Sequence, residues 1–488
     1  IDEKIPFPLE DVTSNYLNPT EFIDITPEIR EKAEEIVTGE DDTYIVAFKV
    51  ATWVHQNINY NLSTLTADVV QKSSWVLETR QGVCDEITNL FISMMRSLGI
   101  PARFVTGMAY TNINNNWGPH GWAEVYFPEK GWVPFDVTYG QFGWIDPTHI
   151  KLKTNADSGD AAIRYTWRAV DTTIEGKEIN LQTEIVEMGE KISSPLEFNI
   201  RPLVDDVGPG SFVPIELEIK NKNSYYLPDS FVVTKATNLT EKNVKSALLK
   251  PGETKKLFWI TKIPTEIQEG YIYVSTMEVE DQFHTTATTE ITYGENLEII
   301  SLEEAQELIR ENSDEPEQKV VSKKLDLICT APRTIFTYQE LQIDCKLKNK
   351  GNTRLNNIET CYLENCQTID LSVAEEKNII FLTNLEKGRQ SLAIEASNNE
   401  VEVSDVLTIE VLEGPELNMS NINYQTIVKY KEPFNISMTL ITKAPIKDIK
   451  IKINNQEALE FQDLETTKQI IISTTGKNIY GSNKRNCT

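Results

Sequence analysis

The stretch RQGVCDEITNLFISMMRSLGIP, residues 80–101, places a cysteine directly before a strongly amphipathic segment. Apolar residues recur there at spacings of three and four, which is the period of an α-helix. Gly99 and Pro101 end the pattern. The sequence therefore predicts a helix that begins at Cys84 and buries one face, formed by Ile87, Leu90, Phe91, Met94, Met95 and Leu98.

The segments around this helix predict an α+β domain over residues 1–165. Apolar residues at near-helical spacing predict a second helix over 43–57. After Pro101 the period changes to that of strands, which we expect at 103–110, 120–127 and 131–138. The last two strands are joined by the turn Pro-Glu-Lys-Gly at 128–131.

The remainder of the chain has a different composition and predicts a series of β-sandwiches. Six of the eight tryptophans and three of the four histidines precede residue 150, and short alternating runs follow. A leucine followed by a short alternating run occurs three times: Leu196 with 215–219, and, with weak similarity, Leu325 with 341–345 and Leu417 with 434–438. We therefore expect tandem immunoglobulin-like sandwiches, the third of them truncated, at 190–296, 321–412 and 413–488, with an acidic linker at 297–320.

The charge balance excludes some classes of partner. Asp and Glu total 74 against 47 Lys and Arg, which gives a formal net charge of −27 that would repel nucleic-acid phosphates. No apolar run is long enough to span a bilayer, and the amino-terminal residues lack an apolar signal core. A membrane anchor would have to lie outside these residues, and the sequence does not reveal the oligomeric state.

Four of the six cysteines lie in one strand-like region, and their spacing points to an oxidising compartment. The simplest pairing is Cys329 with Cys345 and Cys361 with Cys366. Buried reduced thiols are the alternative, whereas a zinc site fits poorly because no paired C-x2-C spacing occurs. We therefore expect a secreted protein or a membrane-anchored ectodomain, extracellular or at the cell surface.

Cys84 is the candidate nucleophile because a helix start stabilises a thiolate through unpaired N–H groups and the helix dipole. Asp85 and Glu86 oppose this ionisation, so a cationic partner is needed. His120 can supply it if a carboxylate holds its ring, and Asp136 is the natural candidate. In the predicted hairpin, His120 lies opposite a position slightly beyond Asp136, so a diagonal pairing or a bulge is expected.

Four motifs in this order resemble the transglutaminase-like superfamily: Arg80-Gln-Gly-Val-Cys-Asp-Glu86, then residues 95–103, then His120-Gly-Trp-Ala-Glu-Val-Tyr126, then Gly131-Trp-Val-Pro-Phe-Asp-Val-Thr138. The resemblance covers residues 50–155. It implies a papain-like fold for the first domain, with Cys84, His120 and Asp136 as nucleophile, base and orienting acid.

The resemblance leaves parts of the site unassigned. The acidic calcium-site segments of animal transglutaminases are not recognisable, so calcium dependence is not carried over, and we expect neither a cofactor nor a metal. The backbone N–H of Cys84 is the expected oxyanion donor, with Trp75 and Gln81 as side-chain candidates. His149 is interpreted as a structural residue near the site.

A Cys–His–Asp site of this kind performs acyl transfer at amide groups of protein or peptide substrates. An amine acceptor gives glutamine–lysine crosslinks, and water gives deamidation. The runner-up is a cysteine protease or peptide amidase on the same fold. From another class, the chain could be an extracellular adhesion or scaffold protein whose first domain is inactive.

Overall fold

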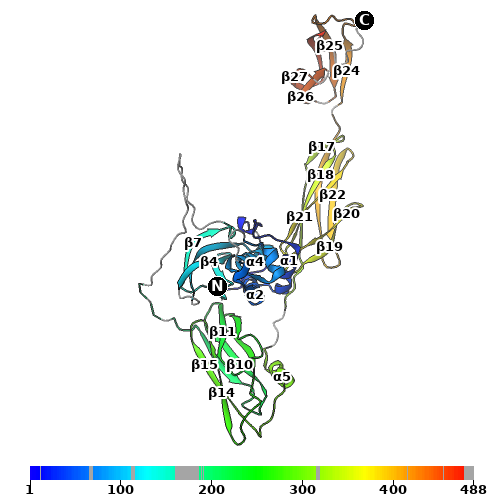
Figure 1. Cartoon of the computed structure of the whole chain (residues 1–488). Helices are drawn as coiled ribbons and strands as arrows, with labels where there is room; N and C mark the ends of the chain where they lie inside the picture. Colours follow the sequence, from blue (N-terminus) through cyan, green and yellow to red (C-terminus); the bar gives the residue numbers. More distant parts are fainter. Residues whose placement is uncertain are drawn as a thin grey trace, which may run out of the picture.

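A computed structural model shows a domain of helices, a five-stranded sheet and a short two-stranded sheet, β1-β2, followed by three β units (Figure 1). The structure describes residues 1–10, 12–64, 70–111, 116–159, 186–187, 189–190, 192–314, 319–414, 416–443, 445–453 and 456–476. Parts of three predicted segments, at 160–165, 315–318 and 477–488, lie outside the described residues.

The helices of the first domain begin where the sequence allows the helix start to be capped. The Thr26 side chain accepts a hydrogen bond from the N–H of Ile29, and the Asp42 carboxylate accepts one from the N–H of Tyr44. Such acceptors satisfy N–H groups that the first turn leaves unpaired. The helices predicted over 43–57 and from Cys84 are confirmed. The helical elements are η1 (Asn15–Leu17), α1 (Pro27–Val37), α2 (Thr43–Asn57), η2 (Leu62–Thr64), α3 (Ser73–Thr79) and α4 (Cys84–Ser97).

Helix α4 is the centre of this domain. Every residue from Glu86 to Ser97 is buried, because the other helices and the sheet surround it. Phe91 of α4 stacks on Phe135 of the sheet with ring centroids 5.6 Å apart. A helix packed on all sides holds its first residue, Cys84, in a fixed place.

One antiparallel sheet, in the order β6-β5-β4-β3-β7, covers α4. The strands predicted at 103–110 and 120–127 are confirmed. The strand predicted over 131–138 ends at Asp136, because its carboxylate accepts the N–H groups of Thr138 and Tyr139 and turns the chain. The strands of the first domain are β1 (Asn59–Tyr60), β2 (Gln81–Gly82), β3 (Ala102–Thr111), β4 (Asn116–Phe127), β5 (Gly131–Asp136), β6 (Gln141–Phe142) and β7 (His149–Asn155).

The first β unit consists of a three-stranded sheet, β13-β10-β8, and a five-stranded sheet, β12-β11-β14-β15-β9, packed over one apolar core. Every pairing is antiparallel except that of β9 with β15. Its strands are β8 (Leu196–Pro202), β9 (Asp206–Val207), β10 (Phe212–Asn221), β11 (Leu227–Lys235), β12 (Val244–Leu249), β13 (Thr254–Lys262), β14 (Ile272–Glu280) and β15 (Thr286–Gly294).

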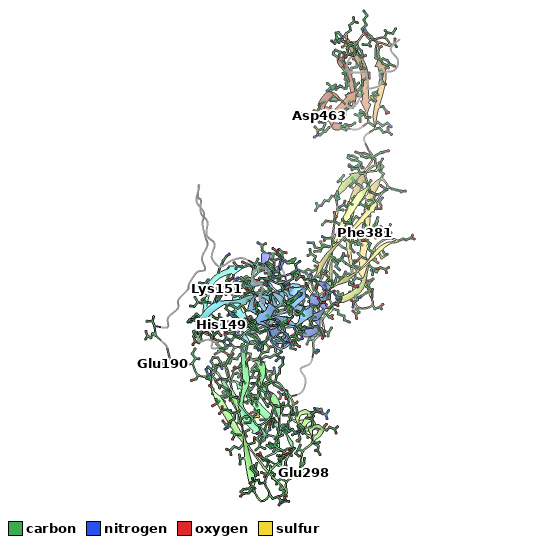
Figure 2. The ribbon with its side chains drawn as sticks, in the orientation of Figure 1. His149, Lys151, Glu190, Glu298, Phe381 and Asp463 are labelled. Carbon is green, nitrogen blue, oxygen red and sulfur yellow. A yellow bond between two sulfur atoms is a disulfide. The ribbon has the colours of Figure 1, made fainter. Side chains whose placement is uncertain are left out.

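The second β unit repeats this topology strand for strand, with sheets β16-β18-β21 and β17-β23-β22-β19-β20. Phe381 of β21 is fully buried in its core (Figure 2). Its strands are β16 (Leu325–Thr330), β17 (Thr334–Phe336), β18 (Leu341–Asn349), β19 (Leu355–Tyr362), β20 (Asn365–Leu371), β21 (Glu376–Thr383), β22 (Gly388–Ser397) and β23 (Glu402–Leu412).

The third β unit contains, among the described residues, counterparts of five of these eight strands. Its sheets are β24-β25-β28 and β26-β27. The three recurring sequence patterns thus fall on equivalent strand pairs, β8 with β10, β16 with β18 and β24 with β25. The strands are β24 (Leu417–Asn423), β25 (Pro433–Thr442), β26 (Ile446–Ile453), β27 (Gln456–Leu464) and β28 (Thr467–Thr475).

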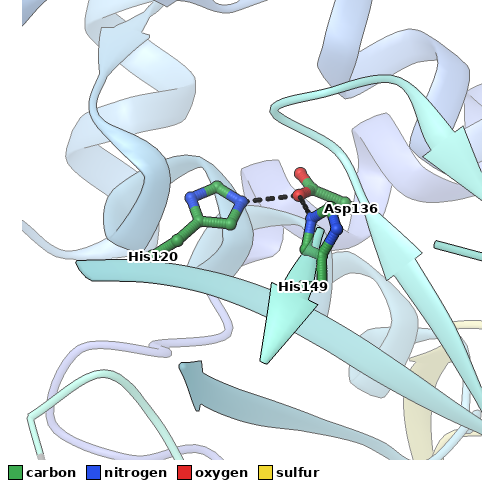
Figure 3. Close-up of side chains that lie close together, drawn as sticks. All are labelled: His120, Asp136 and His149. Atoms are coloured by element: carbon green, nitrogen blue, oxygen red, sulfur yellow. Dashed lines mark hydrogen bonds and ion pairs between the residues drawn. The ribbon is translucent and has the colours of Figure 1, made fainter. Parts of the chain in front are cut away.

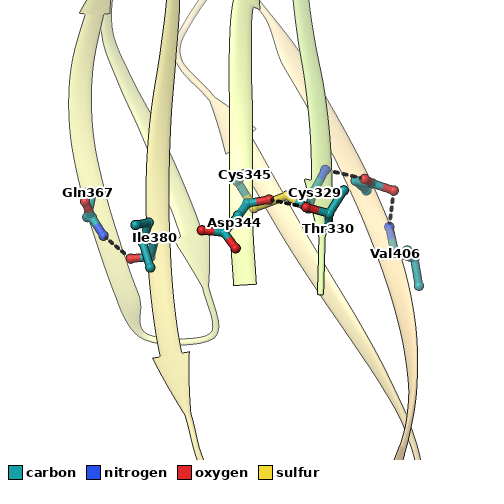
Figure 4. The surroundings of a disulfide bond; sticks show 8 residues. Cys329, Thr330, Asp344, Cys345, Gln367, Ile380 and Val406 are labelled. Carbon is teal, nitrogen blue, oxygen red and sulfur yellow. Dashed lines mark hydrogen bonds between the residues drawn. A yellow bond between two sulfur atoms is a disulfide. The ribbon is translucent and has the colours of Figure 1, made fainter. Parts of the chain in front are cut away.

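Both predicted disulfides are present in the second β unit. Cys329 pairs with Cys345 across β16 and β18, and Cys361 pairs with Cys366 across β19 and β20. The backbone N–H of Cys329 also donates to the Asp405 carboxylate at 2.8 Å, which ties the two sheets together (Figure 4).

The first domain contacts the first and second β units directly. The Tyr226 hydroxyl donates to the Asp42 carboxylate at 2.7 Å, and the Asn352 amide donates to the carbonyl of Glu40 at 2.8 Å. Tyr226, Leu248 and Val373 belong to the same apolar cluster as the first domain's core. The first and second β units therefore pack against the first domain. The third β unit lies beyond the second (Figure 1).

The segment predicted as an acidic linker begins as a helix, α5 (Leu302–Asn312), which packs on β10 of the first β unit. Ser301 caps this helix by accepting from the N–H of Glu304. Within the described residues, no helix is both long and apolar enough to cross a bilayer.

Candidate active site

Cys84 is the first residue of α4 and follows the short strand β2. Val83 precedes the helix and supplies no side-chain cap; instead its N–H donates to the Glu86 carboxylate at 2.9 Å. The sulfur atom therefore lies at a helix start, where unpaired N–H groups favour negative charge. Among the described residues, Cys84 is the free cysteine.

The surroundings of the sulfur keep it protonated in the resting protein. Burial raises the pKa of the Cys84 thiol well above its usual range, and the negative charges of Asp85 and Asp136 raise it further. The Asp85 carboxylate lies 3.6 Å from Sγ. A hydrogen bond from the backbone N–H of Gly121 opposes these effects without overcoming them. The thiol thus needs a nearby base in order to react.

Gly121 allows the start of α4 to approach β4 closely. A Cβ atom at this position would come within 2.3 Å of Phe104 and 2.8 Å of the Asp85 carboxylate. Its carbonyl accepts a hydrogen bond from the Thr88 hydroxyl at 3.2 Å, which fastens α4 to β4. Gly121 contacts Sγ through its N–H and follows His120 in the chain, so the start of α4 lies against the segment of β4 that carries His120.

His120 and Asp136 form a buried hydrogen bond of 2.5 Å between Nε2 and Oδ2 (Figure 3). They occupy diagonal positions on neighbouring strands, since Ala123 pairs with Phe135 and the register places Asp136 opposite Trp122. The diagonal arrangement predicted from the hairpin is therefore confirmed. It sets the imidazole of His120 against the carboxylate at the end of β5.

Asp136 is held as a carboxylate although it is fully buried. Burial alone would raise its pKa, but the charge and hydrogen bond of His120 outweigh burial and hold the pKa well below the usual range. The N–H groups of Thr138 and Tyr139 donate to Oδ1 at 2.8 and 2.9 Å. Because an ionised carboxylate can only accept, Nε2 of His120 carries the proton and Nδ1 is left as the basic nitrogen.

His149 makes a contact that the sequence did not predict. Its Nε2 lies 3.0 Å from Asp136 Oδ2, the same oxygen that His120 contacts (Figure 3). Its Nδ1 lies 3.2 Å from Asp146 Oδ1. Burial would lower the pKa of His149, but its two carboxylate partners raise it to about 9. The segment Asp146-Pro-Thr-His149 carried the signal for one partner, because an Asp three residues away can reach the ring.

Two tyrosines complete the surroundings. Tyr139 stacks on His120 with ring centroids 4.7 Å apart, and its hydroxyl donates to the carbonyl of Tyr110. Burial raises the pKa of Tyr60, and the acidic groups of Cys84 and Asp85 at the start of α4 raise it further. Neither tyrosine was a predicted site residue.

The side chains predicted as oxyanion donors do not contact Cys84 through any described hydrogen bond. The Gln81 side-chain oxygen accepts from the Asn61 amide at 2.9 Å. Trp75 packs against the apolar core of the domain. The backbone N–H of Cys84 at the helix start therefore stays the predicted donor.

The two remaining histidines lie outside this cluster. His55 Nδ1 contacts the carbonyl of Val137 at 3.0 Å, and burial lowers its pKa. His284 is exposed in the first β unit and pairs with Glu280. Of the four histidines, the structure thus brings His120 and His149 together at Asp136.

Residues 30–137 match the family model of the Transglutaminase-like superfamily. The first domain has a transglutaminase-like core. The match spans α1 to the end of β5 and includes Cys84, His120 and Asp136. The family predicted from the four motifs is therefore confirmed for this domain.

Two curated relatives are similar to this chain over segments of 99 and 103 residues. Uncharacterized protein YebA of Bacillus subtilis (strain 168) is 36% identical over 99 residues, 17% of this chain and 13% of that protein. Protein-glutamine gamma-glutamyltransferase of Pseudomonas aeruginosa is 27% identical over 103 residues, 20% of this chain and 15% of that protein. The chain thus spans 13 to 15% of the length of these relatives.

Among solved structures, red sea bream transglutaminase aligns with 80% of this chain and 72% of its own, at 12% identity and a TM-score of 0.19. This score is too low to support a conclusion about how the domains are arranged. The family assignment rests on the transglutaminase-like core alone.

Proposed function

We propose that the first domain is a cysteine acyltransferase that acts on glutamine side chains of proteins and transfers the acyl group to primary amines. The observation that carries this proposal is the buried hydrogen bond between His120 and Asp136 beside the helix start that bears Cys84. The gamma-glutamyltransferase of Pseudomonas aeruginosa, related over 103 residues, supports the choice of glutamine as the acyl donor.

The first half of the reaction forms a thioester. His120 Nδ1 takes the proton of the Cys84 thiol, and the sulfur attacks the carbonyl carbon of the glutamine amide. The imidazolium that forms is stabilised by the Asp136 carboxylate, while the N–H of Cys84 faces the developing oxyanion. The carbon–nitrogen bond then breaks, His120 gives its proton to the leaving nitrogen, and ammonia departs.

The second half consumes the thioester. The amine nitrogen attacks the acyl carbon, His120 takes the excess proton from that nitrogen, and the carbon–sulfur bond breaks. The proton returns to the Cys84 sulfur, and an amide between the two partners is the product. Water in place of the amine would give glutamate, and a backbone amide as donor would make the same site a protease.

We further propose that the chain works outside the cell, and that its β units are of the immunoglobulin-like class. The two disulfides of the second β unit support the first point, because such bonds persist in oxidising compartments. Alternating burial along strands such as β18 and the two-sheet cores support the second.

The decisive experiment incubates the full chain with a lysine-blocked casein and a fluorescent primary amine, and follows both amine incorporation and ammonia release. We expect both signals from the unmodified protein and neither from Cys84→Ser or His120→Ala. Cys487→Ser is the matched thiol control and should keep both.

The other outcomes separate the alternatives. Ammonia release without incorporation would replace transfer by deamidation, and new casein fragments would favour the protease. The absence of all three signals in a folded protein would overturn the enzymatic proposal and favour a scaffold with an inactive domain.

A further inference from the structure

The Asp136 carboxylate has more donors than an orienting acid needs. Its Oδ1 accepts from the N–H groups of Thr138 and Tyr139, and its Oδ2 accepts from two imidazoles, those of His120 and His149. Two backbone donors and the His120 ring already fix the carboxylate. The second imidazole on Oδ2 therefore calls for another explanation.

The contacts of His149 define its charge. Nε2 lies 3.0 Å from Asp136 Oδ2 (Figure 3). Nδ1 lies 3.2 Å from Asp146 Oδ1, and the side chain is fully buried. Both partners are ionised: the charge and hydrogen bond of His120 hold the pKa of the Asp136 carboxyl well below its usual range, and hydrogen bonds from His149, Thr148 and Gln141 do the same for Asp146. Since carboxylates only accept, both ring nitrogens of His149 must donate, and an imidazole with two N–H groups is a cation.

This cation lies close to the reacting groups. The rings of His149 and His120 are 5.7 Å apart, and the Tyr139 ring is 5.5 Å from His149. The Gln141 amide donates to Asp146 Oδ2 at 2.5 Å, and the N–H of Thr148 donates at 2.8 Å to Oδ1, the oxygen that His149 contacts. His149 is thus held between two fixed carboxylates, which leaves it no neutral hydrogen-bonding arrangement.

We propose that His149 is a positioning residue of the acyl-transfer site, a buried cation that shares Asp136 with His120 and sets the charge felt by the Cys84–His120 pair. This inference rests on the proposed function. It assigns to His149 an electrostatic role in place of the structural role that the sequence suggested.

The direction of the effect follows from the charges that face the site. His120 is faced by Asp136 and Tyr139 from one side and by Asp85 from α4, and His149 is faced by Asp136 and Asp146. A cation among these acids makes it easier to form the Cys84 thiolate. Removing the cation moves the titration of the thiol to higher pH.

The test measures the pH profile of Cys84 alkylation by iodoacetamide, quantified on the Cys84 peptide by mass spectrometry, in the full chain. In His149→Gln, the glutamine amide can still donate to Asp136 but carries no charge. We expect its profile to move to higher pH by about 0.5 to 1 unit relative to the unmodified protein. His55→Gln, a nearby histidine that contacts Val137, is the matched control and should not move it.

A second measurement does not depend on any variant folding. Imidazole nitrogen NMR of the unmodified protein, with four histidines to assign, should show His149 doubly protonated at about pH 7.5 while its unperturbed pKa is about 6.5. A neutral His149 at that pH, or a His149→Gln profile lowered in rate but not displaced, would overturn the inference. Alkylation of Cys84 that ignores His120→Ala would instead overturn the proposed function, and the NMR result would still stand.

Discussion

His120 Nε2 and Asp136 Oδ2 are 2.5 Å apart in a buried contact between diagonal positions of β4 and β5. The contact fixes which nitrogen of His120 carries a proton and therefore which nitrogen can act as the base. Cys84 needs such a base, because burial and nearby carboxylates keep its thiol protonated.

Asp136→Asn tests the orienting role. Asparagine keeps the shape of the side chain, but its amide group can donate to Nε2 and so favour the wrong tautomer of His120. We expect the rate of amine incorporation to fall by about 10²- to 10⁴-fold with little change in the melting temperature. A fall of less than about threefold would show that the carboxylate does not orient the base.

Tyr139 tests whether the ring of His120 needs lateral support. Tyr139→Phe keeps the ring that stacks at 4.7 Å and loses only the hydroxyl contact to Tyr110. We expect this variant to stay within about twofold of the normal rate, and Tyr139→Ala to lose about tenfold because the imidazole gains freedom. Equal losses in both variants would assign the effect to the hydroxyl instead.

The buried carboxyl of Asp229 makes the stability of the first β unit depend on pH. Burial and the nearby Asp281 raise its pKa from 3.8 to about 8. A carboxyl whose pKa rises on folding stabilises the fold fully below its unfolded pKa, and this contribution is lost as the pH rises through about 8. Among the described residues, neither Oδ2 of Asp229 nor Oδ2 of Asp281 has a hydrogen-bond partner.

Asp229→Asn should therefore stabilise the first β unit above neutral pH, by about 1 to 3 kcal/mol at pH 8, and by progressively less toward pH 4. The measurement is the melting temperature across this range, with the exposed Asp205→Asn as control. A gain that does not vary with pH would contradict the assigned cause.

Tyr226→Phe tests the contact between the first β unit and the first domain. The tyrosine hydroxyl donates to Asp42, which also caps α2 and is buried. Loss of the hydroxyl leaves a buried carboxylate oxygen without a donor, so we expect the free energy of unfolding to fall by about 1 to 3 kcal/mol. Chemical denaturation measures it, and the exposed neighbour Tyr225→Phe should show no comparable loss.

The sequence predicted the elements that depend on local pattern. Helix α4 and the strands β3 and β4 follow from periodicity, and the disulfides follow from the cysteines being confined to one small β unit. The contact between His120 and Asp136 was predicted because both lie on one hairpin. The catalytic grouping of this pair with Cys84, which opens the central helix, stays a prediction.

Contacts that depend on the curvature of the sheet or on docking between units could not be predicted. His149 begins β7, which lies on the far side of β3 from His120, so no short-range pattern places it at Asp136. Asp229 in β11 and Asp281, directly after β14, are 52 residues apart in the sequence. Tyr226 is 184 residues from Asp42. Such contacts depend on how whole sheets twist and pack.

The most direct test of the central claim is the rate at which iodoacetamide labels Cys84 at about pH 7 in the unmodified protein and in His120→Ala. The account predicts rapid labelling that falls at least about tenfold in the variant, because the variant lacks the imidazole that is proposed to take the thiol proton. Slow labelling at the same rate in both proteins would show an inert cysteine and would contradict the account.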